Sequence, residues 1–198
     1  MVVKSGICEN FYLAGGTAIS IKYNHRYSED FDFFSEKSFS AKLELLLHKL
    51  KEKAQLEVIT LKEDTLIFYL NGVRLSFFKY PYKLLQPAKE FPKLFGVKIA
   101  SDEDIAAMKA VAILQRGTKK DFFDLWFLMK KNRWPLQKVI SLCTKKYGNL
   151  FPQHQFLKAA IYFRDAESEN SFPEVEKSWK EVKEFFTKEV ESILTSDK

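Results

Sequence analysis

The chain has 198 residues, enough for one domain or two small ones with a buried core. With 46 % hydrophobic and 29 % charged residues, its composition excludes a disordered chain. No apolar run reaches the roughly 20 residues that span a bilayer, and the opening residues lack a signal-peptide pattern, so we expect a cytoplasmic protein with no membrane partner. The net charge of +6 is concentrated, because ten basic residues and only two aspartates lie between Lys109 and Lys146. That stretch is either a solvated helical surface or a patch that faces a polyanion.

The first half of the chain has the pattern of a mixed α/β domain. A short strand ends at Gly15 and Gly16 and leads into a helix over about 17–23. Leucines 43, 46, 47 and 50 recur at helical spacing, and Asn71-Gly72 is a strong hairpin signal. The predicted strands cover residues 11–13, 31–34, 55–61, 65–70 and 73–78.

The second half is predicted to be helical. Three prolines interrupt the segment around residues 80–93, so we place a boundary near residue 88, with an α/β domain over 1–88 and a helical domain with a basic surface over 89–198. The fold class is therefore α+β. The predicted helices cover residues 101–116, 119–131, 135–147, 154–164 and 173–195.

Asp30 and Asp32 are the first candidates for chemistry. Residues i and i+2 of a strand project from one face, so the two carboxylates would lie side by side while Phe31 and Phe33 point into the core. A shared proton or a divalent cation relieves their repulsion, and Mg²⁺ (or Mn²⁺) suits an open pair because it also takes waters and substrate phosphates. The alternative is a solvent-exposed pair at a strand end.

The first predicted strand leads into a helix at Gly15, Gly16 and Thr17. A helix N-terminus offers unpaired backbone N–H groups and the positive end of a dipole, which suits a phosphate. The alternative is a simple tight turn. Together with the aspartates, this pattern predicts a site for a nucleoside triphosphate and a metal ion.

Two sequence blocks carry a family resemblance. GGTA followed by DFDF resembles the signature of DNA polymerase β-type nucleotidyltransferases, and the fuller AGGTA…HRYSEDFDFF with AAMKA…RGTKKDFFDL resembles the AbiEii/AbiGii-type nucleotidyltransferase toxins. The resemblance implies a polymerase β-like nucleotidyltransferase domain. It also implies nucleotide-binding roles for Gly15, Gly16, Thr17, Arg26, Ser28 and Lys109, catalytic roles for Asp30, Asp32, Lys109 and Asp124, and metal binding by Asp30 and Asp32.

The later block can also be interpreted from its residues. Lys109 is the only charged residue in the apolar run IAAMKAVAIL, so it either reaches the surface or needs an anion, for which a triphosphate or the aspartates would serve. Asp121 lies three residues after Thr118 and could simply complete a capping box. Asp124 lies past the first turn, and we therefore favour it as the functional acid. Arg26 could contact phosphate or pair with Asp30, although loop packing also explains it.

Enzymes of this superfamily usually carry a third carboxylate on a later strand. Hairpin register puts Ser76 at that position, and serine cannot replace a carboxylate directly. Either Asp124 or Glu29 substitutes for it, or the protein binds nucleotide without efficient turnover.

We therefore predict a Mg²⁺-dependent nucleotidyltransferase that moves a nucleoside monophosphate from a nucleoside triphosphate to an acceptor hydroxyl. The resemblance and the basic stretch favour an RNA acceptor such as tRNA, and the resemblance implies the toxin of an abortive-infection or toxin–antitoxin system with an antitoxin partner. The alternatives are a catalytically impaired nucleotide- or RNA-binding member and a transferase acting on a small molecule.

Overall fold

The computed structural model describes residues 10–39, 47–48, 50–52, 54–94 and 96–196. The chain divides into two compact units, unit 1 with Met1–Lys22 and Ser28–Ser101, and unit 2 with Tyr23–Tyr27 and Asp102–Lys198. Five residues between two segments of unit 1 thus belong to unit 2. Of the leucine-rich helix predicted from sequence, Leu43 and Leu46 lie outside the described residues, whereas Leu47 and Leu50 are buried.

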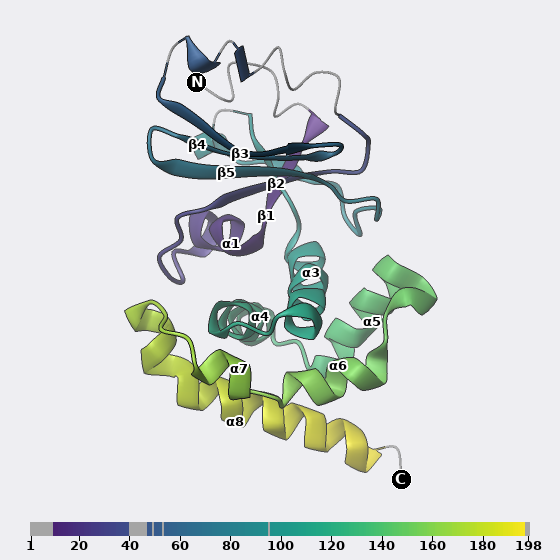
Figure 1. Cartoon of the computed structure of the whole chain (residues 1–198). Helices are drawn as coiled ribbons and strands as arrows, with labels where there is room; N and C mark the ends of the chain where they lie inside the picture. Colours follow the sequence, from purple (N-terminus) through teal and green to yellow (C-terminus); the bar gives the residue numbers. More distant parts are fainter. Residues whose placement is uncertain (1–9, 40–46, 49, 53, 95, 197–198) are drawn as a thin grey trace. The chain divides into compact units, whose positions relative to one another are not determined.

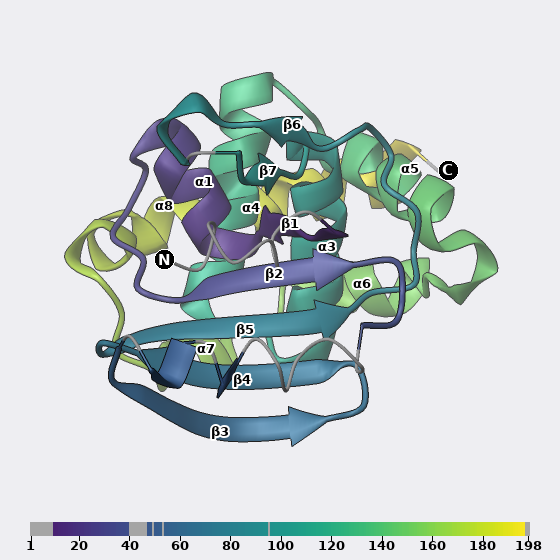
Figure 2. The ribbon, with the colours of Figure 1, turned by 90° about the horizontal axis from the view of Figure 1, so that it is seen from above.

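Unit 1 is built on a seven-stranded mixed sheet with the order β3-β4-β5-β2-β1-β7-β6 (Figure 2). Three strands form an antiparallel meander, and β5 then pairs in parallel with β2, which pairs antiparallel with β1. Asn71 and Gly72 both have positive φ, as the predicted hairpin turn requires. The strands are β1 (Tyr12–Ala14), β2 (Phe31–Ser35), β3 (Leu56–Lys62), β4 (Thr65–Leu70), β5 (Val73–Lys79), β6 (Lys89–Glu90) and β7 (Lys98–Ile99).

The segment over residues 89–101, predicted to belong with the helices, adds β6 and β7 to the sheet instead. β7 pairs in parallel with β1, with Leu13 opposite Ile99, and the Ala100 N–H donates to the Leu13 carbonyl at 3.0 Å. Two-residue strands are too short to show the alternation by which strands are found in a sequence. β7 forms by pairing with the distant β1, and β6 pairs with β7.

Aromatic side chains fill the core of unit 1. Phe33 stacks on Phe77 with ring centroids 4.8 Å apart, and Phe68 stacks on the same ring at 6.0 Å. Helix α1 (Gly15–Tyr23) lies on one face of the sheet (Figure 1) and buries Ala18 and Ile19 completely. The burial of apolar surface between the helix and the sheet holds the turn before α1 in place.

Unit 2 is helical. Its longest helix, α8, contacts α4, α5 and α6 (Figure 1), and it buries Val175, Trp179, Val182 and Phe186, which recur at helical spacing. No helix in the described ranges combines the length and the apolar character needed to cross a membrane. The helices are α3 (Asp102–Gln115), α4 (Lys119–Asn132), α5 (Leu136–Tyr147), α6 (Gln153–Ala160), α7 (Arg164–Glu167) and α8 (Pro173–Ser196).

Candidate functional site

The turn between β1 and α1 brings backbone next to a carboxylate. Gly15 begins α1 with φ +74°, and a Cβ at this position would lie 3.5 Å from Asp32 Oδ2. The positive φ explains the glycine, since other residues are strained there. The first N–H groups of α1 have no partners within the helix, and an Asp32 carboxylate oxygen lies beside Gly15 at the start of that helix.

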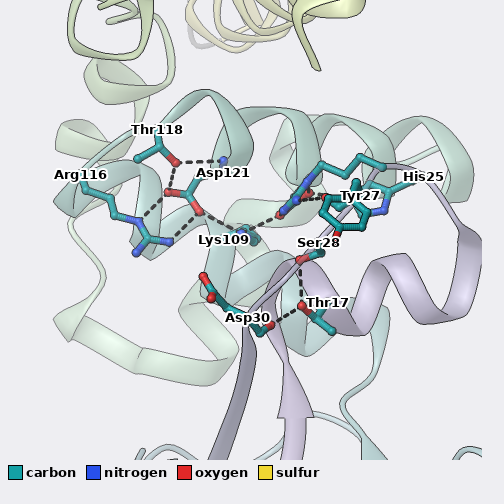
Figure 3. Close-up of polar contacts among 11 residues, drawn as sticks. Thr17, His25, Tyr27, Ser28, Asp30, Lys109, Arg116, Thr118 and Asp121 are labelled. Atoms are coloured by element: carbon teal, nitrogen blue, oxygen red, sulfur yellow. Dashed lines mark hydrogen bonds and ion pairs between the residues drawn. The ribbon is translucent and has the colours of Figure 1, made fainter. Parts of the chain in front are cut away.

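Thr17 ties this helix to the strand that carries the aspartates. Its hydroxyl donates to the Asp30 carbonyl, and its oxygen lies 2.8 Å from Ser28 Oγ (Figure 3). Since the single Thr17 proton goes to Asp30, the Ser28 hydroxyl is the donor in that pair. The side chains of Thr17 and Ser28 are thus engaged with the chain itself, which leaves backbone N–H groups as the donors for an anion.

Asp30 and Asp32 have different surroundings. The Asp30 side chain is 48 % exposed, and Arg74 Nη1 lies 3.8 Å from its Oδ2. Asp32 is half-buried and lies opposite Ser76 of β5. Arg74 and Ser76 share one face of β5 because they are two residues apart. Within the described residues, no group of three or more His, Cys, Asp or Glu side chains is gathered in a way that could hold a metal ion.

Ser76 occupies the position that hairpin register predicts. It is fully buried in β5, and no hydrogen-bond partner for its Oγ exists among the described residues. A buried hydroxyl without a partner is costly. Its place beside Asp32 gives this strand a neutral group rather than a carboxylate.

Lys109 of α3 is buried, with 6 % of its surface exposed. Its Nζ lies 2.8 Å from Asp121 Oδ1 and 2.7 Å from Asp124 Oδ2. The prediction of an anionic partner is confirmed, and the alternative that the side chain reaches the surface is wrong. The partners are two aspartates of α4, and they raise the Lys109 pKa despite its burial.

Asp121 does more than cap α4. Thr118 is the N-cap, and its hydroxyl donates to Asp121 Oδ2 at 2.8 Å. Arg116 adds bonds from Nε at 2.7 Å and from Nη2 at 3.0 Å (Figure 3). Although burial opposes ionisation, Lys109 and Arg116 hold the pKa of the Asp121 carboxyl well below its usual range.

Asp124 is completely buried and is surrounded by cationic groups and a histidine. Its Oδ1 accepts from His25 Nε2 and Arg26 Nε, both at 2.7 Å. Its Oδ2 accepts from Arg26 Nη2 at 2.8 Å and from Lys109. Burial opposes ionisation, yet Lys109, His25 and Arg26 hold the Asp124 pKa far below its usual range. Such a carboxylate is a weak base, and it fixes the segment 23–27 onto α4.

His25 and Arg26 are parts of this cluster. Arg26 is 5 % exposed, and its Nη1 donates to the Tyr27 carbonyl at 2.8 Å. The guanidinium binds Asp124, and the phosphate contact and the Asp30 pairing considered from sequence remain predictions. The His25 ring stacks on Phe123 and contacts Phe127, and burial lowers its pKa. A neutral ring that donates from Nε2 to the carboxylate leaves Nδ1 buried, with no partner in the described part of the chain.

The basic stretch between Lys109 and Lys146 is largely neutralised within unit 2. Acidic partners outside the stretch explain why a sequence window shows a surplus of positive charge: Lys119 pairs with Glu176, Lys130 with Glu181, Lys131 with Asp102 and Lys146 with Asp104. Lys109 and Arg116 pair within the stretch. Only part of the charge expected for a polyanion-facing patch therefore remains unpaired.

Comparisons with known proteins give one family. The family model described as "Nucleotidyl transferase AbiEii toxin, Type IV TA system" matches residues 2–195. The uncharacterized protein aq_aa25 of Aquifex aeolicus (strain VF5) is 47 % identical over 195 residues, which cover 98 % of this chain and 92 % of that protein.

Two solved structures are also similar. MenT4, the nucleotidyltransferase toxin Rv2826c of Mycobacterium tuberculosis H37Rv, matches with a TM-score of 0.56 at 15 % identity over 90 % of this chain and 75 % of its own. The Megavirus polyadenylate synthase matches with a TM-score of 0.48 at 18 % identity, over 66 % of this chain and 30 % of its own. The MenT4 likeness shows a nucleotidyltransferase fold, and the family match over nearly the whole chain shows that this protein belongs to the AbiEii nucleotidyl transferase toxin family.

Proposed function

We propose that this protein transfers a nucleoside monophosphate from a nucleoside triphosphate to an acceptor hydroxyl and uses Mg²⁺ or Mn²⁺. The acceptor oxygen bonds to the α-phosphorus, the bond from that phosphorus to the β-phosphate oxygen breaks, and pyrophosphate leaves. The observation that carries the proposal is the Asp32 carboxylate lying against the Gly15 turn at the start of α1. A carboxylate beside a run of backbone N–H donors suits a cation that bridges to phosphate.

The residues present fit a divalent ion. Asp30 and Asp32 are accessible in part. Asp30 immediately precedes β2 and Asp32 is the second residue of that strand, and two protein carboxylates leave room for the waters and phosphate oxygens that Mg²⁺ takes. When bound there, the ion would neutralise charge on the phosphates and the attacking oxygen.

The chain's own groups have separate tasks in this proposal. Backbone N–H groups at Gly16 and Thr17 bind phosphate oxygens at the start of α1. Lys109 Nζ uses two of its three N–H donors on Asp121 and Asp124, which leaves one donor for the nucleotide-binding role that the family resemblance implies for this residue. Asp124 acts through Lys109 and Arg26 as a positioning residue, since its depressed pKa makes it a poor acceptor for the hydroxyl proton. Exposed Glu29 is then the candidate base.

Label transfer tests the activity. Each nucleoside triphosphate, labelled at the α-phosphate, is incubated with Mg²⁺, total tRNA and either wild type or Asp32→Asn. The proposal predicts labelled RNA with wild type, and a loss of at least a hundredfold with the variant. If wild type leaves tRNA unlabelled with all four nucleotides, the proposal of an RNA acceptor is wrong. If the triphosphates stay unreacted with every acceptor tried, the proposed transferase activity is wrong.

We also propose a toxin role with an antitoxin partner, as the family implies. Expression of wild type should arrest growth, and co-expression of the neighbouring gene should relieve the arrest. Asp32→Asn, expressed at the same level, should leave growth unchanged. Equal arrest by both forms would assign toxicity to something other than nucleotidyl transfer.

Ser76 favours a second candidate function, nucleotide binding without efficient turnover. Its buried and unpartnered hydroxyl beside Asp32 leaves the site without a third carboxylate. Metal-dependent nucleotide binding combined with no labelled product would support this candidate.

A further inference from the structure

Arg74 of β5 lies beside the two aspartates within unit 1. Parallel pairing puts Asp32 opposite Ser76, and Arg74, two residues earlier on β5, reaches Asp30 with its Nη1 3.8 Å from Oδ2. Residues two apart on neighbouring strands share one face of a sheet. We call Asp30, Asp32, Arg74 and Ser76 the β2–β5 group, and all four residues belong to unit 1.

The charge of the β2–β5 group limits how many ions it can hold. One guanidinium against two carboxylates leaves a single negative charge. Two divalent ions in one site lie about 3.5–4 Å apart, and their repulsion has to be offset by the carboxylates around them. Among the described residues, no third Asp, Glu, His or Cys joins the pair to make a metal site. The group therefore has the charge to hold one divalent ion and not two.

Ser76 points to the same number of ions. It is fully buried, and its Oγ has no hydrogen-bond partner in the described part of the chain. A hydroxyl carries no charge, so it cannot offset the repulsion between two ions as a carboxylate in its place would. The face of β5 thus offers the aspartates one neutral group and one cation.

Arg74 is placed to bind an anion as well as Asp30. Its side chain is 33 % exposed, and its contact with Asp30 is longer than a hydrogen bond. The guanidinium forms no hydrogen bond within the described ranges, so its N–H donors are available. Two parallel N–H donors suit phosphate oxygens. On the same face of the sheet, Asp32 lies against the Gly15 turn, where the proposed phosphate site begins.

We propose that the β2–β5 group takes a single divalent ion and that Arg74 supplies the second positive charge, by which it binds phosphate oxygens of the nucleoside triphosphate. The inference rests on the proposed nucleotidyltransferase function and adds how the charge of the triphosphate is balanced. As pyrophosphate leaves, Arg74 stabilises the negative charge that develops on it.

Manganese tests the number of ions directly. Mn²⁺ is titrated into wild type with α,β-methylene nucleoside triphosphates, which lack the bond that the reaction breaks, and is followed by electron paramagnetic resonance. We expect one bound Mn²⁺ per chain and a spectrum without exchange coupling. Two bound ions with an exchange-coupled spectrum would overturn the inference and leave the proposed function standing. No nucleotide-dependent Mn²⁺ binding would contradict the proposed function as well.

Arg74→Gln separates the charge of Arg74 from a structural role. It should strengthen binding of Mn²⁺ alone about threefold, because a cation no longer competes at Asp30. It should weaken binding of inorganic tripolyphosphate and of the nucleotide analogues with Mg²⁺ about tenfold, measured by titration calorimetry. A residue that only stabilised the fold would not shift the two affinities in opposite directions.

Two further variants complete the test. Arg74→Lys keeps the charge and should bind Mn²⁺ alone like wild type. Lys62→Gln removes one positive charge from an exposed residue of β3, two strands away from β5, and should leave both affinities unchanged. If Arg74→Gln binds tripolyphosphate and the analogues like wild type, or if Lys62→Gln weakens them equally, Arg74 is not the phosphate ligand and the inference is wrong.

Discussion

Asp124 illustrates how one buried residue connects several predicted site residues. It accepts hydrogen bonds from His25, Arg26 and Lys109 through two oxygens. Asp124→Asn keeps the shape and removes the charge, so Lys109 and Arg26 lose a buried counter-ion. We predict a loss of about 3–5 kcal/mol in the free energy of unfolding, measured by urea denaturation, together with loss of nucleotidyl transfer.

The control for that change is Asp165→Asn, because Asp165 is exposed on α7. Its unfolding free energy should stay within about 0.5 kcal/mol of wild type. An Asp124→Asn protein as stable as wild type would show that the cluster contributes little to the fold, and full activity in that variant would refute the positioning role.

His25 gives the protein a pH dependence. Burial lowers its pKa from the usual 6.5, so the unfolded chain takes up a proton that the folded chain does not. The free energy of unfolding should therefore fall as the pH drops below about 6.5, by up to about 1.4 kcal/mol per pH unit. Denaturation of wild type between pH 5 and 7.5 measures this slope.

His25→Gln should flatten that slope, since glutamine can still donate to Asp124 and does not titrate in this range. His48→Gln, which changes an exposed histidine, should keep the wild-type slope. The carboxylates of Asp121 and Asp124, whose pKa values are depressed, contribute only in more acid solution. A slope that persists in His25→Gln would assign the pH dependence to another group.

The sequence predicts several residues of the site but not their partners. Position within α4 separates Asp124 from the capping residue Asp121, and the isolated charge of Lys109 predicts an anionic partner. That the partners lie on the next helix, and that His25 and Arg26 join them, depends on packing between segments about 100 residues apart. The sequence signal for this cluster is a pair of blocks with opposite charges, one with His25 and Arg26 and the other with Asp121 and Asp124.

Among the elements, the turn before α1 restricts its residue type most strongly. Gly15→Ala introduces a Cβ at φ +74° and within contact of Asp32 Oδ2. We predict a destabilisation of about 1–2 kcal/mol and weaker tripolyphosphate binding, measured by urea denaturation and calorimetry. Gly72→Ala is the control, because its φ of +80° brings the same strain at a hairpin with nothing within 4 Å. Equal binding by both variants would remove the Gly15 turn from the anion site.

Local periodicity predicts most elements well. The four helices α3, α4, α5 and α8 begin and end within a residue or two of their predicted limits, because their apolar spacing and caps are local signals. β6 and β7 are missed for the opposite reason, since β7 depends on pairing with the distant β1 and β6 on pairing with β7. The proposed division of the chain at residue 88 remains a prediction, and residues 89–101 lie within unit 1.

At the scale of the whole molecule, charge pairing sets how RNA would bind. Six of the ten basic residues between Lys109 and Lys146 form ion pairs among the described residues, so this stretch offers few cations to phosphates. In a plot of the logarithm of tRNA affinity against the logarithm of salt concentration, affinity should fall as salt rises. We predict that this stretch contributes no more than about 4 to the magnitude of that slope. Filter binding across a salt series measures this slope. Lys138→Gln should lower its magnitude by about one, and Lys130→Gln should leave it unchanged. A steeper slope that both variants lower equally would contradict this prediction and support a continuous basic patch that faces the RNA.

In the proposed function, Asp30 and Asp32 hold a divalent ion that nucleotide binding requires. Its most direct test is titration of Mn²⁺ into the protein with each nucleoside triphosphate, followed by electron paramagnetic resonance, for wild type, Asp32→Asn and the control Asp64→Asn. We predict nucleotide-dependent Mn²⁺ binding by wild type and Asp64→Asn, and at least a tenfold loss of affinity in Asp32→Asn. Equal Mn²⁺ affinity in all three proteins would contradict it.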